Sequence, residues 1–254
     1  MTTNALDLAN RLLASDSRWS FRTEAMKNRG LAVVAYVDDT NYDKIAIDDR
    51  RGYAYMFAGP HHLIDRWKDW VKSPSNEHEG EPPVEDEFAI CVIDADSGEL
   101  LFEHGQRVNG ATYRFAGTGA GHAYNCWTTN QDVKLSVMTA MTRDPLSGGK
   151  VVFFDCPTNE NNLYGGVKST SIETQFLERG MVMYYNTQEA RTVPVSLERA
   201  IKDDGSISDL VSAVKAGKVS AEAPSGLDPV IWTEKDRARL KEALTTMRAK
   251  KPKY

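Results

Sequence analysis

The spacing of apolar residues switches between strand-like and helical at only a few points along the chain. The order of these segments constrains the fold more than any other feature. Groups of short strand-like runs stand before and after two helical stretches, at 61–72 and 122–143. In the first stretch the apolar residues recur at steps of three and four, which is typical of an amphipathic helix. Strands that come in groups, without one helix between each pair, favour antiparallel sheets with helices packed outside. The sequence therefore predicts an α+β fold.

The expected strands are short and are bounded by turn residues. The first two form a hairpin about Ala9 and Asn10, because asparagine tolerates the left-handed backbone of a tight turn. Further strands are expected at 31–37, 44–47, 53–57, 88–93, 100–102, 112–116 and 150–154, with weaker candidates at 167–172 and 180–185. The second helical stretch is expected to break near Thr129 and to end before Pro145.

After Val195 the composition changes, and we divide the chain there. Residues 2–195 are expected to form the main domain, and residues 196–254 a C-terminal extension with a charged helix at about 233–249. The stretches 203–209 and 221–226 have the composition of linkers. Residues 73–87 are rich in Pro, Glu, Ser and Asn and are expected to form a surface loop.

Charge and cysteine content exclude several classes of function. The chain has 31 Lys and Arg against 36 Asp and Glu, a net charge of −5, which argues against nucleic acid as the main partner. No apolar run reaches the length of about 18 residues that spans a membrane, and the start of the chain does not resemble a secretory signal. Three cysteines without metal-ligand spacing are typical of reduced thiols. We expect a cytoplasmic protein without metal or cofactor.

The first residues carry a candidate nucleophile. A small residue after Met1 permits removal of the methionine, which gives Thr2 a free α-amine. An N-terminal threonine has its nucleophile and its base in one residue, because an amine with a pKa of about 8 can accept the hydroxyl proton. Many chains begin with Met-Thr, so this feature alone has little weight.

Three further positions have ordinary structural interpretations when each is taken alone. Asp16, two residues before Arg18, is typical of a surface salt bridge. Lys44 lies at the start of a strand, where lysine is usually solvated. Gly59 closes a strand directly before a helix, where glycine is normally structural, although it also exposes its backbone N–H.

Two short motifs bracket the second helical stretch. Gly117-Thr118-Gly119 precedes it, and Arg143-Asp144-Pro-Leu-Ser147-Gly-Gly follows it and leads into a strand. Together with Asp16, Lys44 and Gly59, these motifs stand in an order that resembles the proteasome β-subunit family. That family of N-terminal nucleophile hydrolases includes the bacterial heat-shock-locus peptidase and the ancestral β-subunit proteins. The resemblance covers residues 2–190, and the Arg-Asp-x-x-Ser-Gly-Gly motif is its most specific part.

The resemblance implies a fold and a set of roles. The fold is a four-layer αββα sandwich of two antiparallel sheets with helices outside. Thr2 is the implied nucleophile, Lys44 lies beside its hydroxyl, Asp16 pairs with Lys44, and the N–H of Gly59 is the oxyanion donor.

The remaining roles concern the Thr2 amine. Asp144 and Ser147 are implied to hydrogen-bond around it, Thr118 stands where the family usually has serine, and Arg18 is a structural charge beside Asp16. Pairing Thr2 with Ser17 centres the first hairpin on its predicted turn, and a slip of one residue would turn every side chain to the other face. The register thus favours Thr2 over Thr3 as the nucleophile.

The sequence departs from the family in three places. Extra residues lie near 22–41, the helix that normally follows the first one is replaced by the loop 73–87, and residues 196–254 have no counterpart in compact members.

The resemblance implies a threonine peptidase that hydrolyses peptides or unfolded proteins inside a homo-oligomer, either a ring or a helical assembly, with an ATP-dependent unfoldase as a candidate partner. One alternative is a catalytically silent scaffold of the same fold. Another is an interaction protein whose basic C-terminal helix binds an acidic partner. That helix is also explained by one apolar stripe packed on the body, with Ile231, Leu240 and Leu244.

Overall fold

The computed structural model describes residues 2–22, 27–28, 31–73, 82–165, 170–186, 192–226 and 230–250. The fold is α+β, with two sheets whose described strand pairs are antiparallel. The smaller sheet has the order β10 (Val108–Asn109), β11 (Tyr113–Ala116), β1 (Asn4–Asp7), β2 (Leu12–Asp16), β12 (Val151–Asp155) and β13 (Glu160–Asn161).

The larger sheet combines strands from both ends of the chain. Its order is β15 (Val195–Ser196), β14 (Met181–Tyr185), β5 (Leu31–Val37), β3 (Trp19–Phe21), β16 (Glu222–Ala223), β7 (Tyr53–Pro60), β8 (Ala89–Asp94) and β9 (Leu100–His104). Two short strands lie outside this order: β4 (Lys27–Asn28) pairs with β5, and β6 (Ile45–Asp48) pairs with β7.

The helices of the described residues cover the outer faces of the sheets. They are α1 (His61–Lys72), α2 (Ala120–Asn130), α3 (Val133–Arg143), α4 (Ile172–Arg179), α5 (Leu197–Asp203), α6 (Gly205–Lys215) and α7 (Glu234–Ala249). Among the described residues, none of these helices is both long and apolar enough to cross a membrane.

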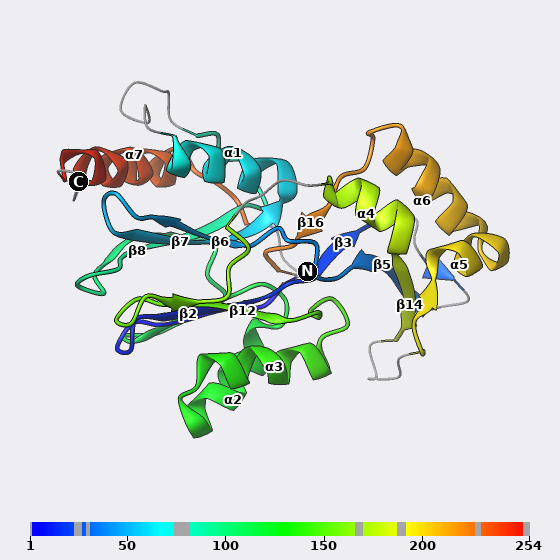
Figure 1. Cartoon of the computed structure of the whole chain (residues 1–254), viewed down its shortest axis with the longest axis horizontal. Coiled ribbons are helices and arrows are strands. Elements are labelled where there is room, and N and C mark those ends of the chain that lie inside the picture. The colour runs from blue at the N-terminus through cyan, green and yellow to red at the C-terminus, as the bar shows by residue number, and fades with distance from the viewer. Residues whose placement is uncertain are drawn as a thin grey trace.

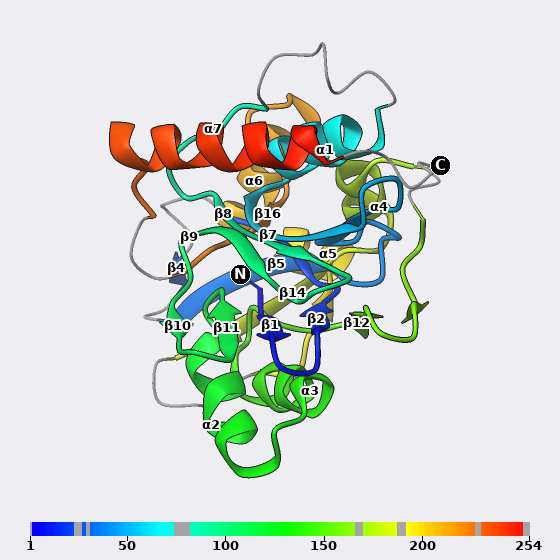
Figure 2. The same cartoon turned by 90° about the vertical axis from the view of Figure 1, so that its left-hand side faces the viewer.

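The two sheets lie face to face (Figures 1 and 2), and a buried apolar cluster joins them. In that cluster Leu6 and Leu13 of the smaller sheet meet Ile45, Met56 and Ile93 of the larger sheet. The α2–α3 pair packs on the far side of the smaller sheet, and α1 and α7 lie over the far side of the larger one (Figure 1). The first residues of the chain therefore enter between the sheets.

Several expected elements are confirmed. The first hairpin pairs Asn4 with Ser15 and Asp7 with Leu12, so its centre lies between Ala9 and Asn10 as predicted. The helix at 61–72 has the predicted bounds. The second helical stretch is two helices, and the break falls at residues 131–132, slightly later than expected.

Three expectations about the later residues are wrong. The expected strand at 167–172 does not extend to residue 172, because Ser171 is the N-cap of α4 and Ile172 is its first residue. Residues 166–169 lie outside the described part of the chain. The linker at 203–209 is the junction of α5 and α6, at which the Asp204 side chain accepts from Ser206 N–H. The linker at 221–226 contains β16. Of the expected loop 73–87, residues 74–81 lie outside the described part.

Residues after Val195 are integrated with the main body. β15 pairs with β14, and β16 lies inside the larger sheet. The charged helix forms as α7 with a capping box between Thr233 and Asp236, and its Leu240 and Leu244 join the core beside α1. The C-terminal region therefore completes the same sheet that residues 2–195 begin.

Candidate active site

Thr2 lies at the mouth of the first hairpin and is fully buried. The backbone N–H of Asp16 donates to the carbonyl of Thr3 at 3.1 Å, so the hairpin register continues beyond β1 and places Thr2 opposite Ser17. Neighbouring residues of a strand point to opposite faces. Thr2 and Thr3 accordingly meet two different groups of side chains.

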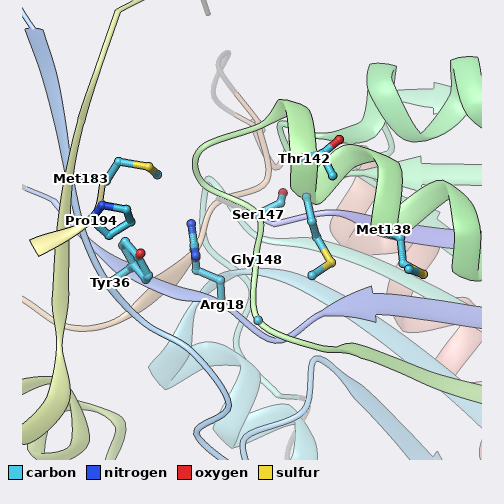
Figure 3. A pocket seen from close by; sticks show the side chains of 10 residues that line it. Arg18, Tyr36, Met138, Thr142, Ser147, Gly148, Met183 and Pro194 are labelled. Carbon is cyan, nitrogen blue, oxygen red and sulfur yellow. The ribbon is translucent and has the colours of Figure 1, made fainter. Parts of the chain in front are cut away.

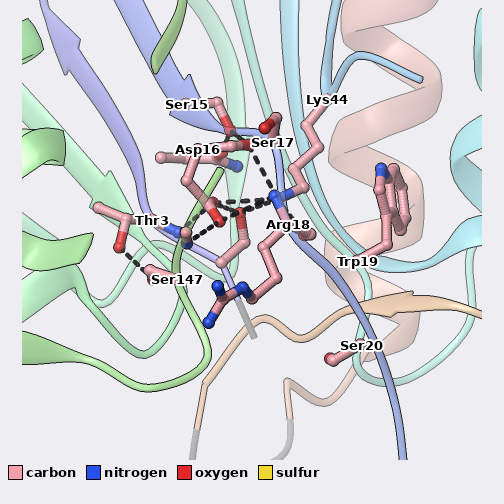
Figure 4. A network of polar contacts seen from close by, with 12 residues as sticks. Thr3, Ser15, Asp16, Ser17, Arg18, Trp19, Ser20, Lys44 and Ser147 are labelled. Carbon is pink, nitrogen blue, oxygen red and sulfur yellow. Dashed lines mark hydrogen bonds and ion pairs between the residues drawn. The ribbon is translucent and has the colours of Figure 1, made fainter. Parts of the chain in front are cut away.

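The first group surrounds the ammonium of Lys44, the residue before β6. Its Nζ donates to Thr2 Oγ1 at 2.8 Å. It also donates to the carboxylate of Asp16 at 3.0 Å and to the backbone carbonyls of Asp16 and Arg18 at 2.9 and 2.7 Å (Figure 4). The Lys44 and Asp16 side chains are both fully buried. Burial lowers the pKa of Lys44, and the carboxylate of Asp16 opposes that shift.

Asp16 is held by donors on both carboxylate oxygens. Oδ1 accepts from the Thr2 hydroxyl and from the N–H of Thr3 at 2.8 Å, in addition to Lys44. Oδ2 accepts from the N–H of Gly148 at 3.0 Å and of Arg18 at 3.3 Å. Gly148 belongs to the Arg-Asp-x-x-Ser-Gly-Gly motif, so this motif is tied directly to the carboxylate beside Thr2.

The second group lies on the other face of the hairpin and centres on Asp144. Its Oδ2 accepts from Thr118 Oγ1 at 2.7 Å and from Ser147 Oγ at 2.8 Å. The oxygen of Ser147 lies 2.7 Å from the hydroxyl of Thr3 (Figure 4). Among the described contacts, this group therefore reaches the hairpin at the hydroxyl of Thr3. Thr3 is buried, and the sequence analysis gave it no role. The strand alternation beside Thr2 is the signal that could have identified it.

Gly59 lies at the end of β7 with a φ of 134°, a conformation that side chains disfavour. A Cβ there would lie 2.8 Å from the carbonyl oxygen of Glu87. Phe57, two residues earlier, donates its N–H to the carbonyl of Lys44 at 2.8 Å, and its own carbonyl accepts from Asn4 Nδ2 at 2.7 Å. The end of β7 is therefore fixed against both the hairpin and the residue that carries the ammonium.

The expected salt bridge between Arg18 and Asp16 is wrong, because the Arg18 guanidinium pairs with Asp38. Nε and Nη2 donate to the Asp38 carboxylate at 2.9 and 2.8 Å, and the guanidinium lies 3.6 Å from the centre of the Tyr36 ring. Asp38 belongs to the extra residues near 22–41. The sequence could not predict this pair, because its acid comes from the part that departs from the family.

A pocket of about 470 Å³ opens beside the second group (Figure 3). Arg18, Tyr36, Ser147 and Gly148 line it together with methionines from α3 and β14. Thr2 does not line this pocket. The pocket therefore reaches the motif that supports the hairpin and not the Thr2 hydroxyl itself.

The paired histidines His61 and His62 begin α1. His61 is buried, with Nε2 3.4 Å from Asp65 Oδ2 and Nδ1 3.8 Å from Glu173 Oε1. Burial lowers the pKa of His61, but the two carboxylates outweigh it and the net shift is upward. The interaction with His61 lowers the pKa of Glu173 to about 2. Within the described ranges no group of three or more His, Cys, Asp or Glu side chains could hold a metal.

Comparison with known proteins assigns no family. No model of a protein family matches this chain, and no curated protein matches it. The geometry of the Thr2 cluster is therefore the starting point for assigning a function.

Proposed function

We propose that this protein is a threonine peptidase of the N-terminal nucleophile type, with the four-layer αββα sandwich of that fold. One observation carries the proposal: a lysine ammonium and a carboxylate, both fully buried, meet at the hydroxyl of the second residue. A buried ion pair costs desolvation and is weak evidence for stability by itself. Its position on a threonine hydroxyl that a single processing step makes N-terminal favours a catalytic purpose.

The proposed reaction uses Thr2 after Met1 is removed. The Thr2 amine accepts the hydroxyl proton while Oγ attacks the carbonyl carbon of the substrate. Positive charge on Lys44 favours the developing alkoxide, and Asp16 holds Lys44 in place. The proton passes to the leaving amine, an ester to Thr2 remains, and water hydrolyses that ester to release the acid and free Thr2.

The N–H of Gly59 is the proposed donor to the oxyanion of the tetrahedral intermediate. Loss of one such donor costs about 3–4 kcal/mol of transition-state stabilisation in a serine peptidase. Thr118, Asp144 and Ser147 are proposed to orient the start of the hairpin. Their described contact with Thr3 supports this role, because it fixes the strand that carries Thr2.

Homo-oligomeric assembly and peptide or unfolded-protein substrates are part of the proposal. Leu135 and Met138 lie three residues apart on α3 and are 42% and 53% exposed. An exposed apolar pair on one helix face supports contact with a second copy. A partner unfoldase stays a prediction.

A catalytically silent scaffold is the second candidate, and the burial of Thr2 favours it. With Thr2 at 0% exposure, a peptide reaches the hydroxyl only after part of the surrounding structure moves.

The test is covalent labelling of the full chain with a β-lactone probe, followed by mass mapping. We expect one adduct, on Thr2, in protein whose intact mass shows loss of Met1. Thr2→Ala should abolish labelling and peptidase activity, and Thr129→Ala, at an exposed position of α2, is the control that leaves the site intact. Retained Met1, or full activity in Thr2→Ala, would contradict the peptidase proposal.

A further inference from the structure

Inside the larger sheet, a strand from far along the chain separates two strands of the N-terminal part. β16 lies between β3 and β7, with Glu222 opposite Ser20 on one side and Ala223 opposite Gly59 on the other. β3 and β7 have no described pairing with each other. They form the two walls of a groove that is one strand wide, and β16 fills it.

Both walls hold the start of this segment through specific groups. The carbonyl of Ala221 accepts from the N–H of His61 at 3.0 Å, and its N–H donates to the carboxylate of Glu173 at 3.4 Å. Glu222 accepts from Ser20 Oγ at 3.3 Å through its carbonyl. An extended chain held by its backbone between two strand edges is the usual geometry of a bound peptide.

The segment then passes the candidate nucleophile. Along an antiparallel ladder, hydrogen-bonded positions alternate with positions that are not hydrogen-bonded. His61 and Ala221 are joined by a hydrogen bond, so they occupy a position of the first kind. Two residues along, Ala223 therefore faces Gly59 at the next hydrogen-bonding position. The carbonyl of Ser225 accepts from the N–H of Gly117 at 3.1 Å.

Gly117 fixes where this stretch lies relative to Thr2. A Cβ on Gly117 would come within 1.8 Å of the Thr2 carbonyl oxygen, so the two backbones are in direct contact. Residues 223–225 thus run from the proposed oxyanion donor, Gly59, to a glycine that touches Thr2. This is the path that a peptide cleaved at Thr2 would follow.

We propose that residues 221–225 are an internal peptide ligand of the groove between β3 and β7, and that the groove takes external extended peptides with alanine-sized side chains at the positions of Ala221 and Ala223. The assignment of Thr2 as the attacking residue rests on the proposed function, whereas peptide binding by the groove does not.

The contacts of the segment define the class of external ligand. Ala221 and Ala223 are fully buried, so the groove has room for small side chains at these two positions. Between them the carboxylate of Glu222 lies 3.2 Å from Nη2 of Arg22, and both side chains are partly exposed. The groove therefore favours a small–acidic–small sequence in an extended peptide, and binds it only when residues 221–225 have left.

The test uses the full chain carrying Thr2→Ala, so that binding is separated from catalysis. A fluorescent peptide with the sequence of residues 219–225 is titrated and its anisotropy measured. Ala223→Glu places a charge where there is space for a methyl group and should displace the internal segment. Ser220→Glu makes a similar charge change at an exposed neighbour and is the matched control. Circular dichroism and thermal melting check that both chains are folded.

We expect the peptide to bind the Ala223→Glu chain at least about ten-fold more tightly than the parent chain or the Ser220→Glu control, the ratio that about 1.4 kcal/mol produces. Glu222→Arg is the second variant if Ala223→Glu does not fold. It places a guanidinium beside that of Arg22 without burying a new charge, and the repulsion should also displace the internal segment. This variant should likewise bind the peptide more tightly than the parent chain. Equal affinity in the parent chain and in the folded variants would overturn the proposal.

Labelling of Thr2 in chains that keep this residue separates the two proposals. If Ala223→Glu labels about ten-fold faster than wild type, both are supported. Fast and equal labelling in wild type and Ala223→Glu supports the peptidase and overturns the internal ligand. Tighter peptide binding without labelling in any chain supports the groove and overturns the peptidase.

Discussion

Replacing Lys44 by methionine keeps most of the side-chain volume and removes the buried ammonium. Four acceptors lose this donor: the hydroxyl of Thr2, the carboxylate and backbone carbonyl of Asp16, and the backbone carbonyl of Arg18. The side chains of Lys44 and Asp16 have no exposed surface, so solvent does not replace the lost contacts. The variant therefore tests the electrostatic core of the candidate site.

The magnitude follows from what remains around the carboxylate. Removing one partner of a buried ion pair costs about 3–5 kcal/mol, because the other charge stays buried. Asp16 still accepts from the N–H groups of Thr3, Arg18 and Gly148, which favours the lower end, about 3 kcal/mol. For a chain of this length that lowers the Tm by about 6–12 °C. The double variant Lys44→Met with Asp16→Asn removes both charges. Its free energy of unfolding should fall by less than the sum of the losses in the two single variants.

Thermal unfolding followed by circular dichroism compares wild type, Lys44→Met, Asp16→Asn and the double variant. β-Lactone labelling of Thr2 is recorded on the same samples. Lys235→Met removes an exposed lysine from α7 and is the matched control, for which we expect no change in either measurement. We expect Lys44→Met to lose labelling even at temperatures where it is fully folded. A loss below about 1 kcal/mol together with unchanged labelling would refute the role of the buried pair.

Three further outcomes follow from single contacts. Gly59→Ala forces a side chain onto a φ of 134° and into a backbone oxygen 2.8 Å away, so urea unfolding should show a loss of about 1–3 kcal/mol; an unchanged midpoint would contradict the strain. Thr3→Val removes the hydroxyl 2.7 Å from Ser147 and should cost about 1–2 kcal/mol in the same assay, with Thr2 still labelled, whereas complete loss of labelling would give Thr3 a more direct role. The pKa of His61 is raised, so its ion pairs stabilise the fold fully below its ordinary pKa of about 6.5 and are lost as the pH rises through the raised value. The pKa of Glu173 is lowered to about 2, so its contribution is present above its ordinary value and is lost as the pH falls toward 2. The difference in free energy of unfolding between wild type and His61→Gln should therefore be largest at mildly acidic pH. A difference that grows as the pH rises would contradict this assignment.

Local patterns were sufficient to predict the elements that hold the candidate site. The amphipathic period gave α1, and the alternation about Ala9 and Asn10 gave the hairpin register, because both are written within a few adjacent residues. α4, α5 and α6 were missed. Asp204 ends α5 and caps α6 with its side chain, so a residue that looks like part of a linker is the junction of two helices.

Long-range partners were the other part that local patterns could not supply. The pair between Arg18 and Asp38 joins a shared motif to a segment with no counterpart in the resemblance. β16 has only two residues in ladder pairs, too few for any alternation to appear. Its strand conformation comes from the walls of the groove, so only the tertiary structure reveals it.

The two threonines show how register decides chemistry where composition does not. Thr2 and Thr3 are identical side chains, adjacent and fully buried. Because the strand alternates, one hydroxyl meets Lys44 and Asp16, and the other meets Ser147. A slip of one residue would exchange these partners and place Thr3, whose nitrogen is an amide in every processed form that keeps Thr2, beside the ammonium. The turn at residues 8–11 thus determines which threonine can combine an amine with a polarised hydroxyl, although it lies at the far end of the hairpin.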